Sequence, residues 1–191
     1  MLSNDFFEVF MEVVAQIFGI IGMIFNIIVF QQKKQKMVLL FQFFAAISFA
    51  VNYFMLGAII GGLLNLVGAL RSVIYYFDKQ TRANSIGWLI FFIIAFASSY
   101  PLNFLVFKTP PTTLNLIIEI LPVIAMIVAT IAIKIGVSKM VRRLGLISSP
   151  LWLTYNCFSG SIGAILSEIF NLISIIVGII RLDIRKKKNK E

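Results

Sequence analysis

The sequence contains no histidine, a single cysteine and few charged residues. Without histidine, the chain cannot form a Ser-His-Asp triad, a histidine zinc site or a histidine proton relay. The lone Cys157 excludes an internal disulfide. Only 13% of the residues are charged, 60% are hydrophobic, and the mean hydropathy is +0.97. Since soluble domains carry about 25% charged residues, this chain needs lipid around its apolar surface.

The 191 residues divide into seven apolar segments, each near the length of about 20 residues that a membrane span needs. We predict helices over residues 9–30, 38–56, 58–77, 86–107, 114–133, 140–158 and 161–182. Two pairs of segments are separated only by short tips that contain Gly57 and Gly160. One helix of about 40 residues would be twice as long as the hydrocarbon layer is thick, so we expect a tight turn at each glycine.

The basic residues gather on one side of this seven-span plan. That side receives Lys33, Lys34, Lys36, Lys79, Arg82, Lys134, Lys139, Arg142, Arg143 and the basic tail over residues 183–191. The other side has Lys108 as its one basic residue, together with Asp5 and Glu8. Because basic loops stay in the cytoplasm, we predict a multi-pass protein of the cell (inner, cytoplasmic) membrane, with its N-terminus outside and its C-terminus cytoplasmic.

The distribution of charge also indicates the partners. We expect the lipid bilayer to surround the chain and the basic tail to contact anionic lipid headgroups. A nucleic-acid partner is not expected, because the positive charge forms no stripe on a soluble surface.

The second part of the chain repeats the first at an offset of 103 positions. Lys36-Met37-Val38 aligns with Lys139-Met140-Val141, and Gly57 aligns with Gly160. We therefore predict an all-α integral membrane protein in which seven transmembrane helices form two parallel three-helix repeats. The first repeat covers residues 1–82, a linker helix and outer loop cover 83–113, the second repeat covers 114–182, and the tail covers 183–191. The linker helix makes the repeats parallel, since each has an odd number of spans.

Two resemblances agree with this plan. The second half carries Leu121-Pro122-Val123-Ile124, then Trp152 and Asn156, then Gly160-Ser161-Ile162-Gly163 with Glu168, and it resembles the bacterial YgjV-type inner membrane proteins. The arrangement of three, one and three spans resembles the SWEET and PQ-loop (MtN3-like) superfamily of small-solute carriers. That resemblance implies a SWEET-like fold and substrate-facing asparagines on the third helix of each repeat.

Polar residues inside the spans are the candidate site, because each needs a partner in lipid. Glu168 lies about 12 Å deep in the last span, and its repeat mate is Asn65, the position that matches the SWEET-like asparagine. We expect both to contact substrate in one wet cavity, although Glu168 also fits a structural role. Arg71 either pairs with Glu168 or extends to the inner headgroups. Asn171 is a second substrate contact or a bond between helices.

A further group of polar and aromatic residues lies in the outer thirds of two spans. Asn52-Tyr53 aligns with Tyr155-Asn156, and Trp152 lies one turn below Asn156. These residues predict an outer vestibule with stacking faces for a neutral solute such as a sugar. The alternative is an aromatic belt at the membrane interface.

These features favour a carrier for a small polar solute, sugar-like or another small metabolite, that works by alternating access. Asn65 and Glu168 contact the substrate in this hypothesis, and Trp152 and Asn156 form the outer gate. The alternative is a non-transporting membrane receptor, scaffold or assembly factor on the same fold. No catalytic set, metal cluster or cofactor motif is present, so we expect no enzyme, metal or cofactor. Substrate identity, ion coupling and oligomeric state are left open.

Overall fold

The computed structural model describes residues 2–32, 34–77, 81–82, 85–135 and 138–180. These residues form helices and no strand, which confirms the all-α prediction. The helices are α1 (Leu2–Gln31), α2 (Gln35–Met55), α3 (Ile59–Tyr76), α5 (Ile86–Leu105), α6 (Thr113–Ile135), α7 (Ser138–Ser159) and α8 (Ile162–Gly178). Each lies on one of the seven predicted segments.

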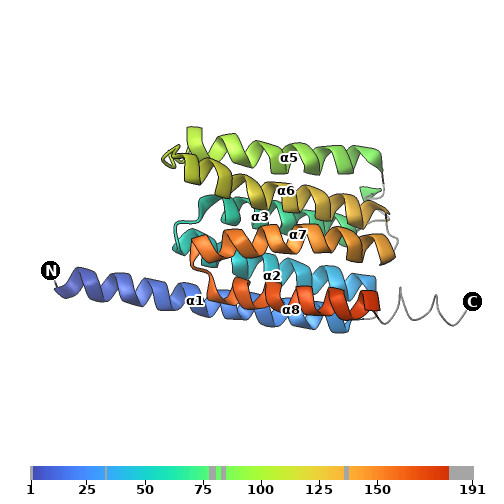
Figure 1. Ribbon diagram of the computed structural model, residues 1–191, viewed down its shortest axis with the longest axis horizontal. Coiled ribbons are helices and arrows are strands. Elements are labelled where there is room, and N and C mark those ends of the chain that lie inside the picture. Colours follow the sequence, from blue (N-terminus) through green and yellow to red (C-terminus); the bar gives the residue numbers. More distant parts are fainter. Residues whose placement is uncertain (1, 33, 78–80, 83–84, 136–137, 181–191) are drawn as a thin grey trace, which may run out of the picture.

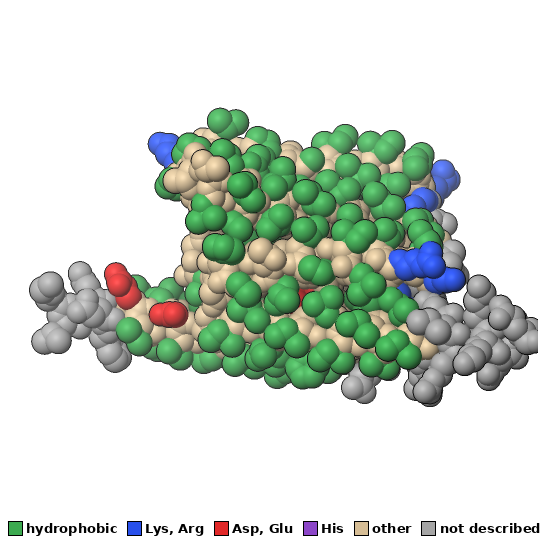
Figure 2. Space-filling view, viewed as in Figure 1, with side chains coloured by type: hydrophobic (Ala, Val, Ile, Leu, Met, Phe, Trp, Pro, Cys, Tyr) green, Lys and Arg blue, Asp and Glu red, His purple; other side chains and the backbone are tan. Residues whose placement is uncertain are grey.

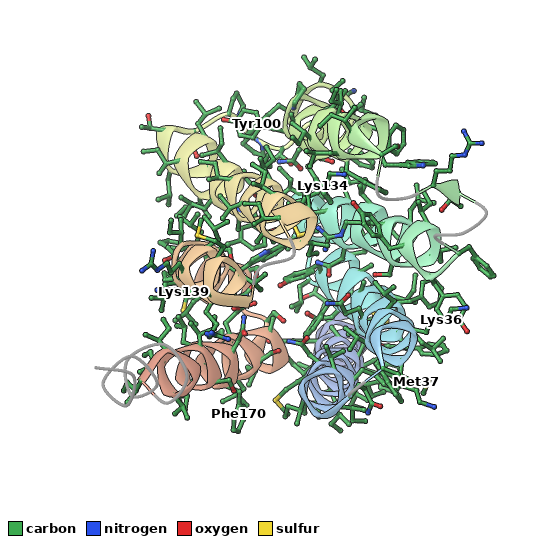
Figure 3. The ribbon with its side chains drawn as sticks, turned by 90° about the vertical axis from the view of Figure 1, so that its right-hand side faces the viewer. Lys36, Met37, Tyr100, Lys134, Lys139 and Phe170 are labelled. Atoms are coloured by element: carbon green, nitrogen blue, oxygen red, sulfur yellow. The ribbon has the colours of Figure 1, made fainter. Side chains whose placement is uncertain are left out.

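Six of these helices form a ring and the seventh lies outside it. Around the ring, α1 packs on α2, α2 on α3, α3 on α6, α6 on α7, α7 on α8, and α8 on α1. Helix α5 packs against α3 and α6 from outside. Figure 3 shows the ring end-on, with α5 beyond it. Successive helices are antiparallel, so that α1 begins at one end of the bundle and α8 ends at the other (Figure 1).

The outer surface of the bundle is apolar. Side chains such as Ile94 and Phe170 are exposed by 61% and 50%, and hydrophobic atoms cover most of the face in Figure 2. Five helices, α1, α2, α3, α5 and α6, are long and apolar enough to cross a membrane. Helix α8 has 17 described residues, and α7 is less apolar because its first turns carry Lys139, Arg142 and Arg143.

The two predicted glycine turns are confirmed. Gly57 joins α2 to α3 with a φ of 72°, and Gly160 joins α7 to α8 with a φ of 69°. Both values lie in the left-handed region, which glycine adopts without steric cost because it has no Cβ. Each turn reverses the chain within a few residues, so the following helix packs directly against the preceding one.

The charges lie at opposite ends of the bundle, as the sequence predicts. Figure 2 shows acidic side chains at the end where α1 begins and most Lys and Arg side chains at the other end. Lys34 directly precedes α2 and Lys36 lies in its first turn, while Lys134 lies in the last turn of α6 and Lys139 in the first turn of α7. Lys108 lies at the acidic end, between α5 and α6. The basic tail, residues 183–191, lies outside the described residues.

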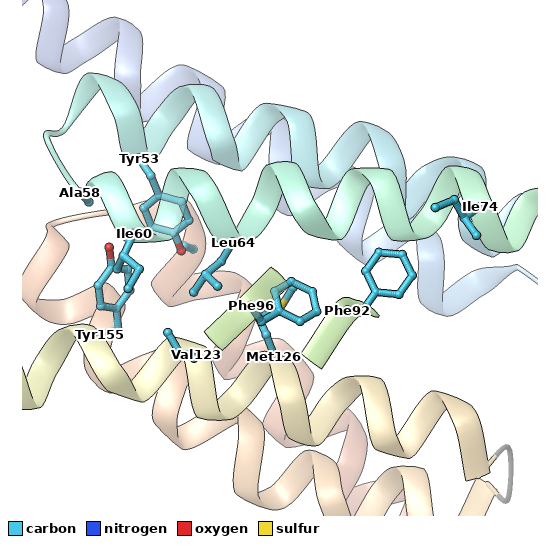
Figure 4. Close-up of a cluster of buried hydrophobic side chains, with 11 residues drawn as sticks. Tyr53, Ala58, Ile60, Leu64, Ile74, Phe92, Phe96, Val123, Met126 and Tyr155 are labelled. Atoms are coloured by element: carbon cyan, nitrogen blue, oxygen red, sulfur yellow. The ribbon is translucent and has the colours of Figure 1, made fainter. Parts of the chain in front are cut away.

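Aromatic side chains hold α5 against the ring. Phe92 and Phe96 of α5 are fully buried, and they belong to one core cluster with Leu64 of α3 and Met126 of α6 (Figure 4). The cluster extends to Tyr155 of α7. This packing places the linker helix on α3 and α6 and leaves the inside of the ring to the other six helices.

Candidate functional site

A cavity of about 450 Å³ lies inside the ring of six helices. Helices α1, α2, α3, α6, α7 and α8 all contribute to its wall, and none of the described lining residues comes from α5. The polar and charged part of the wall consists of Asn26, Gln42, Tyr53, Asn65, Arg71, Ser72, Arg142, Ser148, Ser149, Trp152, Asn156, Ser167, Glu168, Asn171 and Ser174. A cavity with so many hydrogen-bonding groups inside an apolar bundle is suited to a hydrated solute.

Asn65 and Glu168 line this cavity from helices on opposite sides of the ring. Asn65 lies on α3 and Glu168 on α8, and these two helices are three places apart among the six. The Asn65 amide donates to the carbonyl of Gly61 at 2.8 Å, one turn earlier in its own helix. The carboxyl group of Glu168 accepts from the Asn171 amide at 3.3 Å, and the same amide donates to Ser149 Oγ at 2.7 Å. The structure therefore brings the two aligned residues to one cavity.

Arg71 lines the same cavity but makes no ion pair with Glu168, although both residues lie in the described part of the chain. Its guanidinium donates to the hydroxyl of Thr130 at 2.6 Å and lies 5.7 Å from the ring centroid of Phe96. Arg71 lies six residues beyond Asn65, about 9 Å along the helix axis towards the basic end. The neighbouring helix α6 supplies its acceptor, so of the two alternatives for Arg71, the pairing with Glu168 does not form.

Hydrogen bonds between buried side chains close one end of the cavity. The Tyr53 hydroxyl donates to Asn156 Oδ1 at 2.6 Å, and these residues are 2% and 1% exposed. The Tyr155 hydroxyl accepts from the backbone N–H of Gly61 at 2.9 Å. Trp152 stacks on Tyr53 with the ring centroids 6.1 Å apart. Tyr53, Trp152 and Asn156 thus form the wall of the cavity at its closed end, which lies near the Gly57 and Gly160 turns.

Asn52 does not line the cavity, although it precedes Tyr53. Its side chain is fully buried, its amide donates to the carbonyl of Ala15 at 2.7 Å, and its Oδ1 accepts from the Ser161 hydroxyl at 2.5 Å. Both polar atoms of the side chain are therefore occupied. Since successive residues of a helix point about 100° apart, Asn52 joins α1, α2 and α8 while Tyr53 faces the cavity.

Helix α1 strengthens the closed end by two contacts with α8. The Gln16 amide donates to the carbonyl of Gly160 at 2.8 Å, and its Oε1 accepts from the N–H of Ile162 at 3.0 Å. One turn further, Gly19 and Gly163 bring the two helix backbones so close that a Cβ on Gly163 would lie 2.1 Å from the carbonyl carbon of Gly19. Nothing larger than glycine fits at Gly163 without a shift of one helix.

At its other end the cavity reaches the basic side of the bundle. Val29, Ile133, Val141 and Arg142 belong to its wall, and they lie in the last turns of α1 and α6 and the first turns of α7. The cavity therefore extends from the Tyr53–Asn156 bond towards the basic loops.

Several lining residues are absent from the predicted site. Phe49 and Gln42 come from α2, and Ser148 and Ser149 from α7. The internal repeat is the signal for one of them, because Phe49 aligns with Trp152 at the offset of 103. Asn26 of α1 also lines the cavity and donates to the Ser167 hydroxyl at 2.7 Å.

The apolar helices and the internal polar cavity define the class of protein, which is a helical, multi-pass membrane protein. Residues 13–186 match the family described as bacterial inner membrane protein, Imp-YgjV, and the chain belongs to this family. It is therefore a multi-pass inner membrane protein. Comparison with curated proteins and with solved structures gives no match. No group of three potential metal-ligating His, Cys, Asp or Glu side chains occurs within the described residues.

Proposed function

We propose that the protein is a carrier for a small polar solute and that it works by alternating access. The observation that carries this proposal is the polar cavity of about 450 Å³, which is closed at one end by the Tyr53–Asn156 bond and extends to the other end of the bundle. A binding site with one end closed is the arrangement that alternating access requires at a given moment.

The two moving units are α1–α3 and α6–α8, two parallel repeats of SWEET-like plan, with α5 as the linker between them. This proposal is supported by the order of helices in the ring, in which α1 is opposite α6, α2 opposite α7, and α3 opposite α8. It is supported also by the cavity wall, where eleven pairs of residues lie at the offset of 103. These pairs are Asn26 with Ala129, Val29 with Ala132, Gln42 with Gly145, Ala45 with Ser148, Ala46 with Ser149, Phe49 with Trp152, Tyr53 with Asn156, Asn65 with Glu168, Gly68 with Asn171, Arg71 with Ser174, and Ser72 with Ile175. A cavity on the axis between two repeats would be lined in this way.

The Tyr53–Asn156 bond has a special place in this plan. Its two residues are exact repeat mates, so each repeat contributes one partner to a bond that crosses the axis. Rotation of one unit against the other would break it. We therefore assign the gate at the closed end to Tyr53, Asn156 and Trp152, and the substrate contacts to Asn65, Glu168 and Asn171. Asn52 instead serves as a clamp between helices.

The proposal includes seven spans, with α7 and α8 crossing the membrane beside the five strongly apolar helices. The basic end faces the cytoplasm in this orientation, because basic loops are retained there. The N-terminus is then outside, the C-terminal tail is cytoplasmic near anionic headgroups, and the described state has its cavity towards the cytoplasm. We propose no enzymatic activity and no nucleic-acid partner for this cavity.

Uptake into vesicles tests the proposal. The full chain is reconstituted, and gradient-driven uptake of labelled sugars, amino acids, amines and vitamins is measured. The variant Ala46→Trp fills the cavity wall, whereas Ala97→Trp adds the same side chain on the exposed side of α5. A carrier should lose uptake in Ala46→Trp and keep it in Ala97→Trp. Tight binding of a peptide or protein without any flux would favour the receptor or scaffold instead.

A further inference from the structure

We infer that the solute carries a positively charged ammonium group, which binds between the Glu168 carboxylate and the aromatic rings of Phe49, Tyr53 and Trp152. The inference rests on the proposed function in one respect, since it takes the central cavity as the substrate site.

The first observation concerns the Glu168 carboxylate. Glu168 lines the cavity and accepts a hydrogen bond from the Asn171 amide, which is neutral. It forms no ion pair within the described residues, and the guanidinium of Arg71 is directed at Thr130 and Phe96. An ionised carboxylate inside a membrane-embedded bundle is costly, and a compensating charge lowers that cost. A cationic solute would supply that charge at the moment of binding.

The second observation is the aromatic wall of the same cavity. Phe49 and Tyr53 come from α2, and Trp152 comes from α7 on the opposite side of the ring. The ring of Tyr53 contacts both of the others, with its centroid 6.3 Å from that of Phe49 and 6.1 Å from that of Trp152. Aromatic faces attract ammonium groups, and several rings together bind quaternary ammonium most strongly.

Together, the carboxylate and the rings favour an ammonium group over the alternatives. A neutral sugar stacks on aromatic rings but gives Glu168 no compensating charge, and a simple anion gains no attraction from the carboxylate. Arg71 and Arg142 line the part of the cavity nearer the basic end. A solute that bears an anionic group at its other end therefore also fits, with its ammonium group towards Glu168.

Trp152 reports binding directly. The chain has two tryptophans, and Trp88 lies on α5 outside the cavity wall, so the Trp88→Phe background leaves Trp152 as the single tryptophan, which excitation beyond the tyrosine absorption band selects. The full chain in detergent is titrated with choline and with 3,3-dimethylbutan-1-ol, its neutral isostere, and then with n-butylamine and n-butanol. We expect at least one cation to bind about tenfold or more tightly than its neutral counterpart.

Two matched variants locate the charge. Glu168→Gln keeps the size of the side chain and removes its charge, so it should abolish the preference for the cation. Glu119→Gln makes the same change on α6, at a position that does not line the cavity, and should keep the preference. If a variant folds poorly, the comparison of each cation with its neutral isostere in the chain with Glu168 and Glu119 unchanged still tests the inference.

Equal affinity for cations and neutral isosteres would overturn the inference, as would an unchanged preference in Glu168→Gln or a lost preference in Glu119→Gln. Uptake of neutral solutes without cation preference would refute the ammonium site and leave the carrier intact. Cation binding without flux of any solute would refute the carrier and leave the ammonium site intact.

Discussion

Replacing Gly163 by alanine should separate α1 from α8. The added Cβ would lie 2.1 Å from the carbonyl carbon and 2.3 Å from the carbonyl oxygen of Gly19. Non-bonded carbon atoms are most stable at about 3.5–4.0 Å, so the helices must move apart by more than an ångström. The obstacle is backbone, which cannot rotate away as a side chain can.

The free-energy change has two terms of opposite sign. Overpacking of this kind costs about 1–3 kcal/mol, and a clash with backbone belongs near the upper value. Alanine is favoured over glycine inside a helix by about 1 kcal/mol. The net loss is then about 2 kcal/mol, which lowers Tm by about 4–8 °C for a chain of this size. Because this contact joins the two proposed units, uptake into vesicles should fall as well.

Thermal unfolding of the purified chain in detergent measures the effect, with Gly87→Ala as the matched control. Gly87 lies in α5, where the nearest atom to an added Cβ is Ser85 Oγ at 3.8 Å. The control should unfold at the original temperature or slightly above it. Two results would refute this reasoning: Gly163→Ala unfolds at the same temperature as the unsubstituted chain, or Tm falls equally in both variants. In either case the close approach of α1 and α8 does not stabilise the bundle.

Three further outcomes are expected. Tyr53→Phe removes the 2.6 Å bond and leaves Asn156 Oδ1 buried without its donor, so the free energy of unfolding should fall by about 1–3 kcal/mol, and an unchanged Tm would argue against a closed end held by this bond. A reporter fused after Glu191 should be active as a cytoplasmic-type fusion, whereas alkaline phosphatase activity there would contradict the seven-span topology. Cation affinity should be highest at high pH and fall on acidification, because protonation removes the charge of Glu168, and Glu168→Gln should flatten this dependence even though Tyr53, Arg71 and Arg142 also line the wall. A titration of Trp152 fluorescence over pH measures it, and a pH dependence that survives the substitution would assign the effect to another group.

The helices and their turns could be predicted from the sequence because lipid imposes a simple rule. A segment of about 20 apolar residues must satisfy its backbone hydrogen bonds internally, so hydropathy alone locates a helix. Gly57 and Gly160 break two long apolar runs, and no other residue type adopts their φ values as readily. The gathering of basic residues at one end could be predicted as well, because it depends only on the order of helices and loops along the chain.

The candidate site was partly predictable because residues that the internal repeat aligns occupy equivalent positions in the two repeats. The alignment of Asn65 with Glu168 and of Tyr53 with Asn156 brought four lining residues together without knowledge of any contact. Ser148 and Ser149 were not predicted as lining residues, because a small polar residue in a span is equally suited to packing between helices.

What the sequence by itself determined is therefore the set of helices, their turns and the depth of each polar residue, because these depend on local composition and on rise per residue. Tertiary packing decided the direction of each side chain. Asn52 and Tyr53 are neighbours at one depth, yet one binds Ala15 and Ser161 while the other faces the cavity. Arg71 likewise bonds to Thr130 because α6 lies beside α3 in the ring, whereas α8 lies across it. Which helix is a neighbour is a property of the whole bundle, and no single segment encodes it.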